Sequence, residues 1–379
     1  MNDHRGATVL VLGASGLVGN AAVERFLADG ADVIGVSRRE PELDGATIEP
    51  AGPDTPPPGR YTHLSVDLRD GEACRAAATG WDRVTHVVYA AVHELPGLVA
   101  GWFAPEQMTT NLAMLCNVLD PLAERRGALQ RVSLLQGTKA YGAHLHPIRI
   151  PSREREPRDA HANFYWLHED HLRALADGGT GWSFTIWRPQ LIVGPNHGVV
   201  MNLPPVIGAY AAMCRAEDRP FAFPGGASWV WEAVDVRLLA SAISWAADAP
   251  SAANRTFNVT NGEVFEWRDL WPSFADALGV ATGLDEPLSM AAHLPAQAEL
   301  WDRIVREYGL RPIPLDALLG ESHVYADVCF ARSATVSPPP TFLSTVELRR
   351  AGFHDVQDTE ASFRHWFEVL QRRRIIPPR

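Results

Sequence analysis

The chain has 379 residues, of which 46% are hydrophobic, and a formal net charge of −11, which suits about two domains or one domain with a large extension. The acidic balance argues against nucleic acid and anionic membranes as partners, because both favour a basic surface. Four widely spaced cysteines, no apolar run of the ~20 residues that span a bilayer and a strand close to the N-terminus predict a cytoplasmic protein without a signal peptide.

Strands and helices alternate through the first half of the chain. Short apolar or β-branched runs predict strands over residues 8–13, 32–37, 61–66, 83–89, 130–135 and 183–187. Helices are predicted between them over residues 20–29, 106–124 and 163–175. This alternation predicts an α/β fold with a Rossmann-like doubly wound parallel sheet. Its ligand crevice is expected at the carboxyl ends of the strands.

Beyond residue 195 the pattern weakens. Helices are predicted over residues 203–215, 235–247, 267–278 and 344–373, the last with an interruption near Gly352, and strands over 221–226 and 256–262. Three segments read as loops: residues 40–60 on the surface, 92–104 as a lid or pocket wall, and 143–158 at the mouth of the site. We interpret residues 196–379 as a smaller C-terminal substrate-binding cap, interleaved with residues 1–195 and not independent of them.

A glycine turn joins the first strand to the first helix. In Gly13-Ala-Ser-Gly16-Leu-Val-Gly19, Gly13 allows the tight turn, Gly16 lets the backbone approach a pyrophosphate, and Gly19 lets the helix pack on the strand. The phosphates of a dinucleotide would then lie at the helix N-terminus, where free N–H groups favour negative charge. We therefore assign Ser15, Leu17 and Val18 to the cofactor site together with the three glycines.

The end of the second strand discriminates between the two nicotinamide cofactors. It carries Ser37-Arg38-Arg39 in place of the acidic residue that would bind the ribose hydroxyls of NAD. Two guanidinium groups and a hydroxyl suit a 2′-phosphate through charge-assisted hydrogen bonds, although a solvated surface pair is the alternative. The sequence thus predicts NADPH/NADP⁺ and assigns residues 1–195 to an NADP-binding domain.

Other strand ends supply the remaining predicted cofactor contacts. Asp67, followed by Leu68, is placed to bind the adenine amine, and Ala90 and Ala91 allow close approach of the backbone. The further predicted contacts are Gln136, Lys139, Tyr165, Pro189, Leu191 and Ile192.

One lysine stands out. Lys139, just after the fifth strand, is the only lysine among 34 Lys and Arg residues, and arginine does not replace a compact ammonium. Tyr165 and Arg188-Pro189 stand where a short-chain dehydrogenase places its tyrosine and its Arg-Pro pair, but the residue four after the tyrosine is Glu169 instead of lysine. We predict Tyr165 and Lys139 as catalytic residues; a core tyrosine and a surface lysine are the alternatives.

Neither the histidines nor the cysteines predict a metal. His144, His146, His161 and His168 lack the spacing and the acidic or thiol partners of a metal site. We therefore predict none.

The whole chain resembles the progesterone 5β-reductase/iridoid synthase family of atypical (extended) short-chain dehydrogenases. The stretches that carry the resemblance are Gly13–Gly19, Ser37-Arg38-Arg39, Gly137-Thr-Lys-Ala-Tyr141, Asn163-Phe-Tyr-Trp-Leu-His-Glu-Asp170, Met201-Asn202, Phe223-Pro-Gly225, Phe257-Asn-Val-Thr-Asn-Gly262, Phe265-Glu-Trp267 and Ile375-Ile-Pro-Pro378. The resemblance implies NADPH-dependent reduction of the C=C bond of an enone by Tyr165 and Lys139. Trp166, Gln136 and Gln190 depart from its usual tyrosine, threonine and glycine, so the family's natural substrates do not carry over.

The residues suit this chemistry. Hydride addition to the β-carbon of an enone moves charge onto the carbonyl oxygen, where a phenol hydroxyl can stabilise it, and a nearby ammonium would give Tyr165 phenolate character. Trp102, Trp166 and Met201 are expected to bind a small apolar enone. The alternatives are a carbonyl reductase or extended-type sugar-nucleotide epimerase, and a non-catalytic NADP-binding sensor. The donor of the second proton is not identified, and the protein is expected to be a monomer or homodimer.

Overall fold

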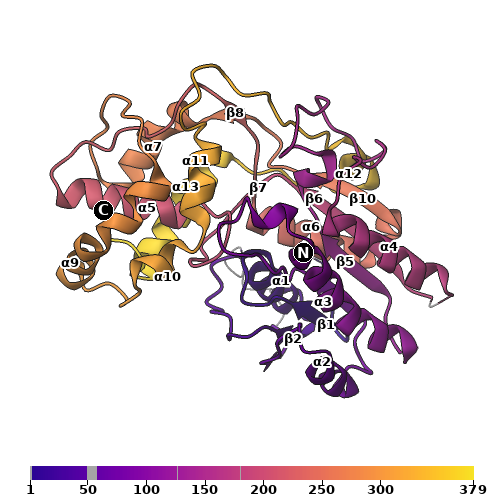
Figure 1. Cartoon of the computed structure of the whole chain (residues 1–379). Coiled ribbons are helices and arrows are strands. Elements are labelled where there is room, and N and C mark those ends of the chain that lie inside the picture. The colour runs from indigo at the N-terminus through magenta and orange to yellow at the C-terminus, as the bar shows by residue number, and fades with distance from the viewer. Residues whose placement is uncertain (1, 49–57, 126, 180) are drawn as a thin grey trace.

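The computed structural model describes residues 2–48, 58–125, 127–179 and 181–379, so residues 49–57 of the predicted surface loop lie outside the described residues. Figure 1 shows two lobes, one built on a sheet and the other mainly helical. No helix within the described ranges has the length and apolar character needed to cross a membrane.

A seven-stranded parallel sheet forms the first lobe. In the described chain its strand order is β10-β6-β5-β4-β1-β2-β3. The strands are β1 (Thr8–Leu12), β2 (Asp32–Val36), β3 (Tyr61–Leu64), β4 (His86–Tyr89), β5 (Arg131–Leu135), β6 (Ser183–Pro189) and β10 (Arg255–Val259). The predicted doubly wound parallel sheet is confirmed, and its central strands are apolar because helices bury both of their faces.

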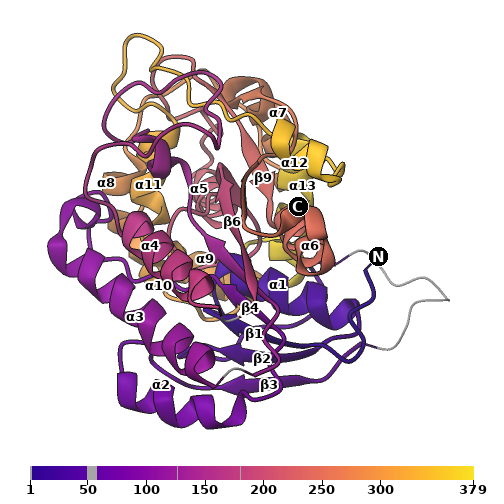
Figure 2. The ribbon, with the colours of Figure 1, turned by 90° about the vertical axis from the view of Figure 1, so that its right-hand side faces the viewer.

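Helices cover the sheet on two sides, as Figure 2 shows. α1 (Leu17–Ala28) and α6 (Val236–Asp248) pack together on one face. α2 (Gly71–Ala77), α3 (Pro105–Glu124) and α4 (Phe164–Asp177) lie on the other. α2 was not predicted from the sequence, because seven residues are too short to show helical periodicity.

The second lobe contains most of the C-terminal helices around an aromatic core. They are α5 (Pro204–Ala216), α7 (Trp267–Leu278), α8 (Met290–His293), α9 (Ala298–Tyr308), α10 (Leu315–Leu319), α11 (Ser322–Cys329) and α13 (Thr359–Arg372). The strand predicted over residues 221–226 is wrong: the segment forms only one isolated bridge, from Phe221 to Thr282. The Phe221 ring instead stacks on Trp271 in the core, with ring centroids 4.4 Å apart.

Two short strand pairings and one further helix complete the description of the C-terminal half. β7 (Leu191–Val193) pairs with β9 (Ala233–Asp235), and β8 (Val230–Trp231) pairs with β11 (Phe265–Glu266). α12 (Val346–Ala351) packs on β10, and the interruption predicted near Gly352 separates it from α13.

Segments on both sides of residue 195 build the sheet lobe. α6 and β10 follow that residue in sequence, yet β10 pairs with β6 and α6 packs on α1. The layers of the sheet lobe therefore draw on both halves of the chain.

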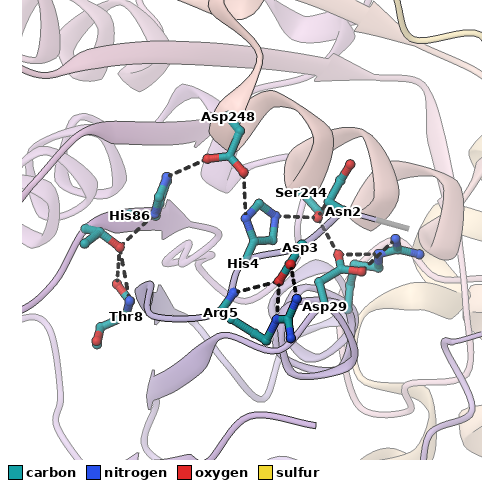
Figure 3. A network of polar contacts seen from close by, with 11 residues as sticks. Asn2, Asp3, His4, Arg5, Thr8, Asp29, His86, Ser244 and Asp248 are labelled. Atoms are coloured by element: carbon teal, nitrogen blue, oxygen red, sulfur yellow. Dashed lines mark hydrogen bonds and ion pairs between the residues drawn. The ribbon is translucent and has the colours of Figure 1, made fainter. Parts of the chain in front are cut away.

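A polar network, buried except at Asp248, lies near the amino-terminal end of β4 (Figure 3). His4 contacts Asp248 at 3.0 Å and Ser244 Oγ at 3.0 Å. Ser244 donates to Asp29 at 2.6 Å, and His86 Nε2 lies 4.0 Å from Asp248. The network fixes α6 to α1 and β4, at the end of the sheet opposite to the crevice.

Candidate active site

A cavity of about 780 Å³ lies at the carboxyl ends of the strands and extends under the cap. All of the predicted cofactor contacts except Gly19 line it, and so do Trp102 and Met201. The crevice predicted for a doubly wound sheet is therefore a real cavity, with the predicted residues on its wall.

The glycine turn is shaped as a cradle. Gly13 has φ +81°, and a Cβ at this position would lie 2.9 Å from the Ala91 backbone. Gly16 caps α1 without any side-chain hydrogen bond to the helix, which leaves the first N–H groups of α1 for an anion. Gly19 lies behind the cavity wall, where a Cβ would meet the Gly13 carbonyl oxygen at 2.1 Å. The turn thus fits the pyrophosphate of a dinucleotide.

Replacing Gly19 by alanine is expected to push α1 away from the turn, because the added methyl would overlap backbone that has no flexible side chain to yield. Overpacking of this kind costs about 1–3 kcal/mol. We expect a lower free energy of unfolding and weaker NADPH binding, measured by denaturant titration and fluorescence. Gly80→Ala is the matched control, because a Cβ at Gly80 meets nothing within 4 Å; equal effects of the two substitutions would contradict the cradle.

The adenosine end of the cavity is basic. Arg38 and Arg39 are exposed at the end of β2 and line the cavity. The Ser37 hydroxyl donates to the Arg39 carbonyl oxygen at 2.6 Å and so shapes the loop that carries both guanidinium groups. Asp67 is held by Arg69 at 2.6 Å, which keeps the pKa of its carboxyl at about 2.

Tyr165 and Lys139 lie in two neighbouring segments, and the side chain of Asn163 bonds to the backbone of both. Tyr165 lies in the first turn of α4, and Lys139 in a short 3₁₀ helix, Thr138–Tyr141, that follows β5. Asn163 caps α4 by accepting from the Tyr165 N–H at 3.0 Å, and its amide donates to the Lys139 carbonyl oxygen at 3.3 Å. The Tyr165 hydroxyl lies beside Gly137, where a Cβ would be 3.3 Å from it.

The ionisation of Tyr165 differs from the phenolate character expected from the sequence. Burial raises the pKa of Tyr165, Glu94 raises it further, and Arg188 opposes them, so the phenol stays protonated and donates. Burial lowers the pKa of Lys139 to about 8, and Glu94 opposes that shift. The Lys139 ammonium lies 3.6 Å from the centroid of the Trp102 ring, a cation–π contact. The electrostatic partner of Lys139 is thus Glu94, and the expectation that the lysine gives Tyr165 phenolate character needs correction.

The position four after Tyr165 has a structural role. Glu169 is buried and accepts from Arg173 at 2.7 Å and from the Gln136 amide at 3.3 Å. Arg188 donates to Gln136 at 2.9 Å and lies 3.7 Å from Glu169. Glu169 is thus paired with arginines, and a lysine at this position would break the network.

Trp166 does not line the cavity, which corrects its assignment to the substrate site. Consecutive residues of a helix point about 100° apart, so Tyr165 faces the cavity while Trp166 packs near His161, Arg158 and Arg188. Aromatic residues of the cap supply the wall instead, namely Trp229, Trp231 and Tyr325.

Several polar side chains on the cavity wall were not assigned to the site from the sequence, among them Glu94, His144 and His168. Glu94 lies in the segment interpreted as a lid. Burial lowers the pKa of both His144 and His168 to about 4, so both rings are neutral near pH 7. Within the described residues, Cys116, Asp120 and His171 have the side-chain types of a metal site, but they lie outside this cavity.

Comparisons with known proteins agree with this geometry. The sequence profile of the NAD dependent epimerase/dehydratase family matches residues 9–260. (S)-8-oxocitronellyl enol synthase of Antirrhinum majus is 29% identical over 328 residues, which cover 83% of this chain and 80% of the relative. The enzyme of the same name from Catharanthus roseus is 27% identical over 389 residues, covering 98% and 92%.

Solved structures share the fold. UDP-glucose 4-epimerase of Thermus thermophilus, solved with NAD, superposes with a TM-score of 0.59 at 18% identity, over 95% of this chain and 98% of that one. The resemblance to the progesterone 5β-reductase/iridoid synthase group is confirmed by the curated relatives, and the extended short-chain dehydrogenase fold by the solved structures.

Proposed function

Because this chain belongs to the NAD dependent epimerase/dehydratase family and is an NAD(P)-dependent oxidoreductase of the short-chain dehydrogenase/reductase superfamily, we propose that it reduces the C=C bond of α,β-unsaturated carbonyl compounds with NADPH. The observation that carries the proposal is the pairing of Lys139 and Tyr165 on one cavity wall through Asn163. Asn163 holds the two backbone segments side by side, and this supports a shared role for the Lys139 ammonium and the Tyr165 phenol in a chain that lacks the usual lysine four residues after the tyrosine.

The protein groups have distinct tasks in this reaction. NADPH, when bound, supplies the hydride that adds to the β-carbon. The Tyr165 hydroxyl is a protonated donor and would bond to the substrate carbonyl oxygen as charge develops there, as in an oxyanion hole. The curated relatives are named as synthases of an enol, which is what an enolate gives when its oxygen is protonated.

Two further features support NADPH and an apolar substrate. Arg38 and Arg39 line the adenosine end with no hydrogen bond or ion pair from their side chains to other described residues, so both guanidinium groups are available to a 2′-phosphate. Trp102, Trp229, Trp231 and Met201 give the other end an apolar wall, which suits a small neutral enone.

The test is an assay of NADPH oxidation with 2-cyclohexenone and with simple ketones, followed by product identification. We expect saturated ketone from the enone and no oxidation with the ketones. Allylic alcohol would instead indicate carbonyl reduction, and tight NADPH binding without turnover would indicate a sensor.

The pH dependence of kcat/KM should report the ionisation of the Lys139 ammonium. Its pKa is lowered to about 8, so the ammonium is charged below pH 8 and is lost above it. If the charge is required, kcat/KM is constant below pH 8 and falls about tenfold per pH unit above it, since this parameter reports ionisation of the free enzyme. Tyr165 adds no limb in this range, because its pKa is raised.

Lys139→Arg provides the control for that profile, because a guanidinium stays protonated throughout the range. Its activity is expected to be lower, but the fall above pH 8 should disappear. If the fall in kcat/KM above pH 8 persists in this variant, it is caused by the ionisation of another group.

A further inference from the structure

Glu94 is held in a fixed orientation on the cavity wall. It follows β4 in the loop over residues 90–100 and is partly buried. Gln107 of α3, only 1% exposed, donates to Glu94 Oε2 at 2.5 Å. The other end of the same amide accepts from the Leu95 N–H at 2.8 Å, so Gln107 clamps both the side chain and the backbone beside it.

The second carboxyl oxygen is available to a ligand. No other described residue forms a hydrogen bond or ion pair with Glu94 Oε1, and the residue lines the cavity. Glu94 lines the same cavity as Lys139 and Tyr165. Among the described lining residues the other carboxylate is Asp67, which Arg69 occupies. Of these two carboxyl groups, Glu94 is the one without an arginine partner and with an oxygen left for a ligand.

Formation of a saturated ketone needs a proton as well as the hydride. Hydride addition leaves an enolate, and a saturated ketone forms only when a proton reaches the α-carbon. The Tyr165 hydroxyl is assigned to the carbonyl oxygen of the substrate. The Lys139 ammonium lies over the Trp102 ring. Burial raises the pKa of Glu94, while Lys139 and Gln107 oppose the shift. A raised pKa favours the protonated form that a general acid needs.

We propose that Glu94 is a second catalytic acid, which transfers its Oε1 proton to the α-carbon of the enolate; the inference rests on the proposed enone reductase. The enolate electron pair forms the new C–H bond, the carbonyl double bond is restored, and Glu94 is left as a carboxylate that regains a proton from solvent. In total, one hydride and one proton add across the C=C bond. Delivery by a fixed group selects one face of the α-carbon.

The test substrate is 2-methyl-2-cyclohexenone, because protonation creates a stereocentre at its α-carbon. The wild-type protein is expected to give one enantiomer of 2-methylcyclohexanone in excess, measured by chiral gas chromatography in short reactions. Glu94→Gln keeps the size of the side chain and a carbonyl acceptor for Gln107 but has no acidic proton. This variant should release the enol, which solvent protonates on both faces in roughly equal amounts, and the protein-catalysed proton transfer should fall by about 10²-fold or more.

Two variants control the result. Glu106→Gln changes an exposed glutamate in the first turn of α3, outside the cavity, and should keep the wild-type excess. Glu94→Asp retains a carboxylic acid with a shorter reach and should restore part of the enantiomeric excess. A merely structural role of Glu94 would not predict this recovery. The same variant tests the inference if Glu94→Gln does not fold. An unchanged excess in Glu94→Gln, or a racemic wild-type product, would overturn the inference alone. A wild-type protein that reduces no enone would overturn the proposed function.

Discussion

Replacing Tyr165 by phenylalanine is expected to lower kcat for an enone by about 10²–10³-fold, or about 2.7–4 kcal/mol of barrier, the usual loss when one oxyanion donor is removed. The reason is the position and ionisation of the group. Its hydroxyl faces the cavity beside Gly137, and its pKa is raised, so it donates a proton in a hydrogen bond. The measurement is steady-state kinetics with 2-cyclohexenone, with NADPH affinity determined separately.

Tyr141→Phe is the matched control for the phenol. Tyr141 is a buried tyrosine in the neighbouring 3₁₀ helix, and its hydroxyl donates to Asn258 at 2.6 Å outside the cavity. Its loss should cost about 1 kcal/mol of stability and leave kcat close to the wild-type value. A similar kcat for Tyr165→Phe and wild type would remove Tyr165 from the mechanism.

Replacing both Arg38 and Arg39 by alanine is expected to reduce the preference for NADPH over NADH by roughly 10²-fold or more. Each charge-assisted hydrogen bond to the 2′-phosphate is worth about 1.5–3 kcal/mol, and about 1.4 kcal/mol corresponds to a factor of ten. NADH lacks this phosphate, so its kcat/KM should change little. The measurement is the ratio of kcat/KM for the two cofactors.

Arg60→Ala tests whether that effect is specific. Arg60 is exposed near the start of β3, paired with Asp32 at 3.0 Å, and lies outside the cavity. Removing it changes the net charge by one unit without touching the cofactor site. A preference that survives the double substitution would contradict the assignment of Arg38 and Arg39.

Local sequence patterns predicted the sheet and its ligand end well. β-branched runs identified most strands of the first half, and the ends of parallel strands meet at one edge, which is why Gly13, Ser37, Asp67 and Lys139 line one cavity. Long-range pairing could not be predicted in this way. The strand expected over residues 256–262 was identified, but its partner β6 is some 70 residues earlier in the chain.

At the candidate site, the sequence did not predict which way side chains point or which residues they contact. Trp166 differs from Tyr165 by one helical step and points elsewhere. Tyr325 reaches the cavity wall from α11, a helix that was not predicted. Glu94 follows β4 in a segment without periodicity, and its proximity to Lys139 depends on tertiary packing. A single sequence gives no signal for such contacts.

The late return of β10 to the sheet sets a limit on how this protein can be divided. A fragment that stops at residue 195 would leave β6 as a bare rim, with the backbone groups of Ser183–Pro189 that now pair with β10 unpaired. It would also strip α6 from the apolar surface of α1. Such a fragment is expected to aggregate through that rim, so during synthesis the nucleotide-binding lobe is complete only after residue 259 has left the ribosome.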